Sequence, residues 1–265
     1  MSGGSRGIGL AIALRAARDG GNVALLAKTA EPHPRLEGTV FTAAEQIEAA
    51  GGHALPVVGD VRDDDSVADA VRRTVERFGA IDIVVNNASA IDVSPSETIA
   101  MKRYDLMQDV NTRGTFLLSR TCVPHLREAP NPHVLTLSPP LSLDPKWYGG
   151  HLAYTLAKFG MSMCTLGMAA EYAEAGIAFN SLWPRTLIAT AAVQNLLGGD
   201  AAMARSRRPE IVADAAHHIL TRPARETTGN FFIDDEVLAE AGVHDLSAYT
   251  YTDDADLQVD LFLDG

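Results

Sequence analysis

The chain opens with Met1-Ser-Gly-Gly-Ser-Arg-Gly-Ile-Gly9, in which the spacing from Gly3 onward is G-x-x-x-G-x-G. The apolar-rich segment Leu10–Asp19 follows directly and predicts a helix that ends at the Gly20–Gly21 pair. Glycines let a backbone approach a pyrophosphate closely, and a helix N-terminus offers free N–H groups and the positive end of a dipole. A glycine-rich turn by itself also fits an ordinary loop, so its meaning depends on the rest of the chain.

Segments typical of strands and helices alternate after this loop. The predicted strands are Asn22–Ala27, His53–Val58, Ile81–Val85, His133–Leu137, Ile177–Leu182 and Asn230–Ile233. The predicted helices are one that a capping box Thr42-Ala-Ala-Glu45 opens and that runs through Ala50, then Ser66–Phe78, Met101–His125, Ala153–Ala175 and Pro209–Leu220. Such alternation predicts an α/β fold, a doubly wound parallel sheet with helices on both faces.

The start of the chain departs from this pattern. A doubly wound sheet normally leads into its first glycine loop with a buried strand, and no such strand precedes Ser2 in the sequence. Either Met1 is an internal residue of a longer chain, or the molecule tolerates the loss of a central strand. Because that loss would exceed the roughly 5–15 kcal/mol of stability of a typical domain, we favour the first explanation.

The charge of the chain is concentrated near its end. The sequence has 22 basic and 34 acidic side chains, and eleven of the acidic ones but none of the basic ones lie from Glu226 onward. The nearly neutral remainder argues against nucleic-acid binding, which needs clustered Lys and Arg. We expect residues 1–265 to form a single domain with an acidic C-terminal extension at about 234–265. This extension holds too many apolar residues for a solvated tail, and it predicts either a cover over a substrate cleft or an oligomer contact.

Composition narrows the class of protein further. Hydrophobic residues make up 46% of the chain and charged residues 21%, as in ordinary globular proteins. Cys122 and Cys164 lack metal-ligand spacing, and adjacent His217–His218 would point about 100° apart on a helix, so we expect no bound metal. With no apolar run of about 18 residues and no signal-peptide pattern, we expect a cytoplasmic protein with reduced thiols that does not enter membranes.

Polar residues follow the predicted strands where ligands bind in open α/β sheets. Asp60-Val61 ends one strand, Asn86-Asn87-Ala88-Ser89 ends the next, and Asn111 lies in the helix after it. The alternative for the asparagine pair is a simple turn.

Tyr154 and Lys158 form the strongest chemical signal in the sequence. They lie four residues apart on one helix face, so both can project into one cleft. A Lys ammonium beside a phenol favours phenolate, which would lower a tyrosine pKa near 10 toward the range of a general acid/base. The alternative is a partly exposed tyrosine beside a surface lysine.

Taken together, Ser2–Gly9, Asn86–Ser89, Asn111 and Tyr154–Lys158 resemble, in order and spacing, the short-chain dehydrogenase/reductase family over nearly the whole chain. The resemblance implies a Rossmann fold and an NAD(P)-dependent oxidoreductase. It implies Tyr154 as proton donor or acceptor, Lys158 lowering the Tyr pKa while holding the nicotinamide ribose, and Asn111 holding a water in a proton relay.

The match to the family pattern is incomplete around the catalytic serine. The family has a serine about thirteen residues before the tyrosine, but residue 141 is Leu. Ser138, which ends a predicted strand as the family serine does, is our preferred candidate, and Ser142 remains possible within the Pro139–Gly150 loop. Pro184-Arg185 replaces the usual Pro-Gly; Arg185 either reaches a substrate or cofactor group or points to solvent.

The resemblance also assigns the cofactor contacts. The implied cofactor-binding residues are Gly3, Ser5, Arg6, Gly7, Ile8, Gly9, Lys28, Asp60, Val61, Asn87, Ala88, Ser89, Tyr154, Lys158, Pro184 and Thr186. Lys28 and Arg6 at the adenosine ribose favour NADP(H), and NAD(H) is less favoured. Glu31 and Arg35 lie in the neighbouring Thr29–Gly38 insertion and could rearrange this end of the site.

The substrate and the assembly are less sharply defined. Leu137–Leu141, Ala169–Glu171 and Trp183–Arg185 look most like the hydroxysteroid dehydrogenase-like branch of the family, from which steroid specificity does not follow. We expect an apolar small-molecule carbonyl or alcohol substrate, with a pocket wall drawn from Leu141, Trp147, Tyr148, Trp183, Leu187, Leu196 and Leu197, although each could equally be core. The alternative function is a non-catalytic NADP(H)-binding sensor or scaffold.

The resemblance further implies a homo-tetramer or homo-dimer packed through the Tyr154–Ala175 helix. The apolar positions Met161, Cys164, Leu166 and Met168 allow such packing, or they are buried within one subunit.

Overall fold

The computed structural model describes residues 1–33, 36–253 and 256–264; Pro34 and Arg35 of the insertion lie outside the described residues. The strands are β1 (Asn22–Ala27), β2 (His53–Val58), β3 (Ile83–Asn86), β4 (His133–Thr136), β5 (Ala178–Trp183) and β6 (Phe231–Ile233). The helices are α1 (Gly7–Ala17), α2 (Val40–Ala49), α3 (Asp64–Phe78), α4 (Met101–Met107), α5 (Gly114–Leu126), α6 (Leu152–Glu171), α7 (Gly199–Ala204), α8 (Glu210–Leu220) and α9 (Asp234–Glu240). All strand pairs are parallel, as predicted, with β1 beside β2 and the order β3-β4-β5-β6 in the other group.

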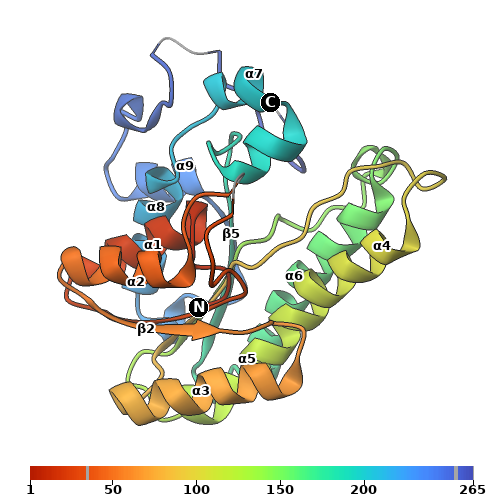
Figure 1. The fold of residues 1–265 in the computed structure, drawn as a ribbon. Coiled ribbons are helices and arrows are strands. Elements are labelled where there is room, and N and C mark those ends of the chain that lie inside the picture. Colours follow the sequence, from red (N-terminus) through yellow and green to blue (C-terminus); the bar gives the residue numbers. More distant parts are fainter. Residues whose placement is uncertain (34–35, 254–255, 265) are drawn as a thin grey trace.

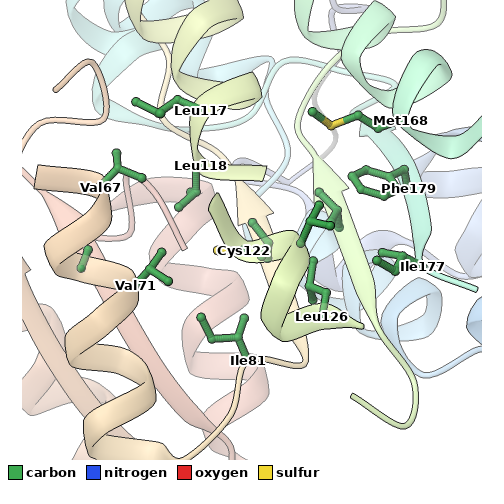
Figure 2. Packing of buried hydrophobic residues seen from close by; sticks show 14 of the residues in the cluster. Val67, Val71, Ile81, Leu117, Leu118, Cys122, Leu126, Met168, Ile177 and Phe179 are labelled. Atoms are coloured by element: carbon green, nitrogen blue, oxygen red, sulfur yellow. The ribbon is translucent and has the colours of Figure 1, made fainter. Parts of the chain in front are cut away.

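Helices cover both faces of the sheet, as the alternation predicts. Figure 1 shows α1 and α8 to one side of the strands and α3, α5 and α6 to the other. Neighbouring residues of each central strand point to opposite faces, so Val134 packs with the α3–α5 cluster while Leu135 packs with α1 and α8. Figure 2 shows the first cluster, in which side chains of α3 and α5 meet over the sheet. Both faces are therefore apolar, which explains the continuous hydrophobic runs in these strands.

Local capping sets where two of the helices begin. The predicted capping box at Thr42–Glu45 is wrong by one turn: Thr39 is the cap, and Thr42 is the residue that closes the box with it. Helix α3 begins at Asp64 because the Asp63 carboxylate accepts a hydrogen bond from Ser66 N at 2.7 Å. Polar side chains one turn apart satisfy the same capping pattern, so the sequence did not distinguish between the possible first residues of these helices.

The predicted helix over Met101–His125 contains a wider turn. Residues Gln108–Arg113 form a π-helical segment between α4 and α5. Within it, the Thr112 hydroxyl donates to Ala157 O of α6 at 3.1 Å, and Gly160 leaves the space that Thr112 fills. Such π-turns often occur at functional sites.

Residues Met1–Gly3, here called the stub, lie between β1 and β3. Ser2 N donates to Val85 O at 3.0 Å, and Leu26 N donates to Met1 O at 2.9 Å. Beyond the stub lies a cavity of about 320 Å³, lined by residues of both strands. Among the described residues the two strand groups are therefore joined by Met1–Gly3, close to the carboxyl ends of the strands.

The acidic extension folds back onto the rest of the protein. After α9, the Tyr249 hydroxyl donates to the Asp214 carboxylate of α8 at 2.7 Å. Residues Gln258–Leu263, which we call the strap, then run beside the segment that follows β5, where Thr186 pairs with Val259. Within the described part of the chain, no helix is long and apolar enough to cross a bilayer.

Candidate active site

A cleft of about 780 Å³ lies at the carboxyl ends of the parallel strands. The glycine loop, the ends of β1 and β3, helix α6, the segment after β5 and the strap all contribute to its wall. Open parallel sheets bind ligands at this edge, because loops from several strands converge there.

The glycine loop packs so closely on the end of β3 that side chains are excluded. A Cβ on Gly9 would lie 2.5 Å from Asn87 Nδ2 and 2.6 Å from Gly3 O, and one on Gly3 would lie 2.9 Å from Ala88 Cα. Gly3 also has a φ of +69°, a conformation that L side chains rarely adopt. Asn87 completes the contact by donating to Gly3 O at 2.8 Å. The first turn of α1 carries no acidic side chain and faces the cleft, so its N–H groups suit an anion.

Charges at the far end of the cleft are paired within the protein. Asp60 forms ion pairs with Lys28 at 3.1 Å and with Arg62 at 2.7 Å, and these cations hold the pKa of Asp60 well below its usual range. The Arg6 guanidinium donates to the carbonyl oxygens of Glu37 and Gly38. Lys28 nevertheless remains largely exposed, with 61% of its side chain accessible.

Most predicted cofactor residues share this cleft. Those that line it are Gly3, Ser5, Arg6, Gly7, Ile8, Lys28, Asp60, Val61, Asn87, Ala88, Ser89, Tyr154, Lys158 and Pro184. Gly9 lies behind the wall against Asn87, and Thr186 is buried beside the strap. Thr190, four residues after Thr186, lines the cleft instead.

Asn111 is fully buried and holds the chain after β3. Its Nδ2 donates to Ala90 O at 3.0 Å, and its Oδ1 accepts from Ala90 N at 2.7 Å. Both polar atoms of the Asn111 side chain are thus hydrogen-bonded to the main chain of Ala90. This contact fixes Ser89 and Ala90 at the cleft wall.

Tyr154 and Lys158 are both buried at the cleft wall on α6. The Lys158 ammonium donates to Leu137 O at 2.9 Å and lies 5.0 Å from the centre of the Trp183 ring. Burial lowers the pKa of Lys158 to about 8. Burial also raises the pKa of Tyr154 well above its usual value, and Asp260 adds to this rise. Burial therefore opposes the lowered Tyr pKa that the sequence predicts, and that lowering stays a prediction.

Neither candidate serine lies in the cleft. The Ser138 hydroxyl is buried and hydrogen-bonds the Ser181 hydroxyl at 2.9 Å, which in turn donates to Thr165. The Ser142 hydroxyl accepts a hydrogen bond from Asp144 N, and the Ser142 carbonyl oxygen accepts one from the Tyr148 hydroxyl. The preference for Ser138 rested on its place at the end of β4, but its side chain points into the protein interior.

The predicted pocket wall divides into two groups. Trp183, Leu187, Leu196 and Leu197 line the cleft, whereas Leu141, Trp147 and Tyr148 pack in the apolar cluster behind Tyr154. Arg185 does not line the cleft: its partly exposed guanidinium pairs with Asp235 at 3.1 Å and with Glu236.

The strap supplies residues that the sequence did not single out for the site. Asp260 and Leu261 line the cleft, and the Phe262 ring packs on Tyr154 with ring centres 6.0 Å apart. Phe262 has a φ of 75°, which costs a non-glycine residue about 1–2 kcal/mol. Burial of its ring, which is only 4% exposed, offsets this cost. The apolar residues of the acidic extension were the sequence signal that could have pointed to the strap.

The fold and the cleft define a short-chain dehydrogenase. The family model for short chain dehydrogenases matches residues 1–199, and the chain belongs to this family of oxidoreductases. The chain is 53% identical over 264 residues to hydroxysteroid dehydrogenase-like protein 2 of Xenopus laevis, and 50% identical to the human protein of that name. The matches cover the whole chain but only 63% and 62% of the lengths of these relatives.

Solved structures agree with this assignment. The crystal structure of a short chain dehydrogenase from Mycobacterium thermoresistibile has 59% identity and a TM-score of 0.94, covering 100% of this chain and 94% of its own. More distant structures share the fold: a metagenomic short-chain oxidoreductase in complex with NADP, at 24% identity and TM-score 0.71, and carveol dehydrogenase from Mycobacterium avium in complex with NAD, at 21% and 0.76. They cover 88% of this chain and 93% and 94% of their own.

The contact between the glycine loop and β3 predicts the effect of one added methyl group. Gly9→Ala should lower the free energy of unfolding by about 1–3 kcal/mol, because its Cβ would overlap Asn87 and the backbone of Gly3. Gly150→Ala is the matched control, since nothing lies within 4 Å of its Cβ position and it should stay within about 0.5 kcal/mol. Chemical denaturation measures both, and equal stability of the two variants would contradict the packing described.

Proposed function

We propose that the protein is an NADP(H)-dependent oxidoreductase that interconverts an alcohol and a carbonyl on a mainly apolar small molecule. The observation that carries this proposal is the meeting of Tyr154 and Lys158 with the glycine loop in one cleft. Apolar side chains such as Trp183 and Leu187 dominate the wall near Tyr154, which suits an apolar substrate.

The residues present fit a nicotinamide dinucleotide. The glycine loop gives the close backbone approach and the helix N-terminus that a pyrophosphate needs, and Asp60 with Lys28 stands at the adenosine end. In this proposal Lys158 would hold the nicotinamide ribose. When bound, the cofactor would supply or accept the hydride, and the protein would supply alignment and proton handling.

Tyr154 is our candidate for the proton-transferring group. Its raised pKa keeps the phenol protonated at neutral pH in the ligand-free protein, which suits donation to a carbonyl oxygen that becomes an alcohol. Lys158, cationic below a pKa of about 8, would stabilise the phenolate left behind. A relay water near Asn111 remains a prediction, and we propose that the Asn111 side chain acts by holding Ala90 in place.

The chemical role of Tyr154 is tested by removing its hydroxyl. Tyr154→Phe should lose at least a hundredfold in kcat on any carbonyl that the protein reduces with NADPH, because the proton donor is gone. Tyr148→Phe is the control, since its hydroxyl donates to Ser142 O outside the cleft and should leave kcat within a few-fold.

A carbonyl library screened with NADPH by cofactor absorbance would supply the substrate for this test. Full activity of Tyr154→Phe would refute the proposed chemistry. Tight NADPH binding without turnover on any compound would favour the alternative of a sensor or scaffold, which no feature of the cleft favours.

Cofactor choice is predicted from the cations at the adenosine end. The exposed Lys28 and the nearby Arg6 favour a 2′-phosphate, so kcat/KM should be higher with NADPH than with NADH. Lys28→Glu should narrow that preference about tenfold or more, equivalent to about 1.4 kcal/mol. Lys102→Glu makes the same charge change at an exposed position of α4 that does not line the cleft, and it should not alter the ratio. Equal kcat/KM with both cofactors in the unmodified protein would refute the predicted preference for NADPH.

We also propose that the protein is a homo-dimer or homo-tetramer that packs through α6. Met161 and Met168 are buried within the subunit, which leaves a different face for an interface. Leu156, Met163 and Leu166 of α6 are each 44–60% exposed and form that face.

We also propose a cytoplasmic location for the protein. The free thiols of Cys122 and Cys164 support this proposal.

Charges placed on this face should dissociate the oligomer. The double variant Met163→Lys, Leu166→Lys should shift the mass measured by light scattering to that of a monomer, because two ammonium groups would be buried without partners. Leu143→Lys, at a loop position that is 91% exposed, is the control and should not change the mass. An unchanged oligomer in the double variant would exclude this helix from the interface.

A further inference from the structure

The segment between β1 and α2 forms part of the cleft wall. We call its described residues 29–33 and 36–38 the flank, and three of them line the cleft: Thr29, His33 and Leu36. Leu36 N donates to His33 O at 3.1 Å, so the chain turns back within the flank. Because Thr29 follows Lys28 directly, the flank joins the wall at the end of the cleft where Lys28 pairs with Asp60.

Main-chain contacts close the base of the flank. Val40 N donates to Thr29 O at 2.9 Å, which joins the residue after β1 to the first residue of α2. Thr39 caps α2, because its side chain accepts a hydrogen bond from Thr42 N at 3.1 Å and its N–H donates to Thr42 Oγ1 at 2.8 Å. The flank is therefore fixed both where it leaves β1 and where it enters α2.

The Arg6 guanidinium ties the flank to the glycine loop. Its Nε donates to Glu37 O at 2.9 Å, and its Nη2 donates to Gly38 O at 2.8 Å. Both acceptors are main-chain oxygens, so these bonds fix the path of the chain. A guanidinium presents its donors in a rigid planar fork, which a lysine ammonium lacks.

Gly38 brings the flank into direct contact with the same loop. Its φ is +79°, and a Cβ at this position would lie 2.9 Å from Ser5 O, closer than Cβ atoms approach other atoms. Ser5 and Arg6 are neighbours in the glycine loop, so the flank rests on that loop at two adjacent residues. The glycine loop and the flank therefore form one packed unit.

We propose that Arg6 is a positioning residue for the adenosine part of the cofactor: its fork of hydrogen bonds holds the flank in the cleft wall, where Leu36 would pack on the adenosine. The inference rests on the proposed NADP(H)-dependent function and adds a wall that serves NADPH and NADH alike. The charge of Arg6 favours a 2′-phosphate, whereas its fork acts on a part of the site that both cofactors share.

A methyl group at Gly38 tests the flank without changing any charge. In Gly38→Ala the added Cβ would overlap Ser5 O, so the flank must shift away from the glycine loop. The dissociation constants of NADPH and NADH, measured by isothermal titration calorimetry, should both rise about fivefold or more, because apolar contact with the adenosine is lost. The two increases should agree within about twofold.

Gly242→Ala is the matched control for this variant. Gly242 also has a positive φ, of +86°, but nothing lies within 4 Å of its Cβ position and it does not line the cleft. The substitution therefore brings similar backbone strain without displacing the flank. Both dissociation constants should stay within about twofold of those of the unmodified protein.

Two substitutions of Arg6 separate its fork from its charge. Arg6→Lys keeps the charge and removes the fork, so it should weaken the binding of NADPH and NADH by a similar factor. Arg6→Gln also removes the charge and should weaken NADPH further than NADH. Loss of affinity for NADPH alone in Arg6→Lys, or unchanged affinity for both cofactors in Gly38→Ala, would overturn the inference.

Hydrogen exchange in the cofactor-free protein measures the hold of Arg6 on the flank. The amide protons of Leu36 and Val40, which donate to carbonyl oxygens of the flank, should exchange about fivefold faster or more in Arg6→Lys and in Gly38→Ala. The amide of the buried Leu135 in β4 should not change. Unchanged exchange at Leu36 and Val40 would overturn the inference and leave the proposed function standing. An unmodified protein that binds neither cofactor would refute the proposed function, whatever the exchange rates.

Discussion

The burial of the Lys158 ammonium is the constraint around which this protein is arranged. A buried cation without partners costs several kcal/mol, so a fold that keeps one must supply compensation from every side. Lys158 itself comes from α6, the end of β4 contributes the Leu137 carbonyl, and the end of β5 contributes the Trp183 ring. Three segments that are distant in sequence are thereby required to meet at one point.

Close contacts also surround the glycine loop at the carboxyl ends of the strands. There, Gly3 and Gly9 press against Asn87, and Asn111 clamps Ala90. These contacts lie at the edge of the sheet where the cleft forms.

Much of the fold could be predicted from the sequence, because hydrophobic runs and glycine stops are local signals. The strands Asn22–Ala27 and His53–Val58 match their predicted bounds, and the parallel arrangement is confirmed. The cap at Thr39 and the π-turn around Asn111 could not be predicted. The first depends on which of two equivalent threonines starts the helix, and the second on how Thr112 meets Gly160 of another helix.

For the site, the sequence predicted which residues share the cleft better than it predicted their environment. Tyr154 and Lys158 lie together as expected, since helical spacing fixes that relation. The raised pKa of Tyr154 and the inward turn of Ser138 depend on tertiary contacts with Phe262 and Ser181. Those partners are far away in the chain, and no local pattern announces them.

The aromatic packing around Phe262 has a practical consequence. The chain contains two tryptophans, and both Trp147 and Trp183 contact this ring. Trp183 also gives its indole N–H to the strap and its ring face to Lys158. The tryptophan fluorescence of the protein therefore originates beside Phe262, so a change in this emission reports on movement of the strap.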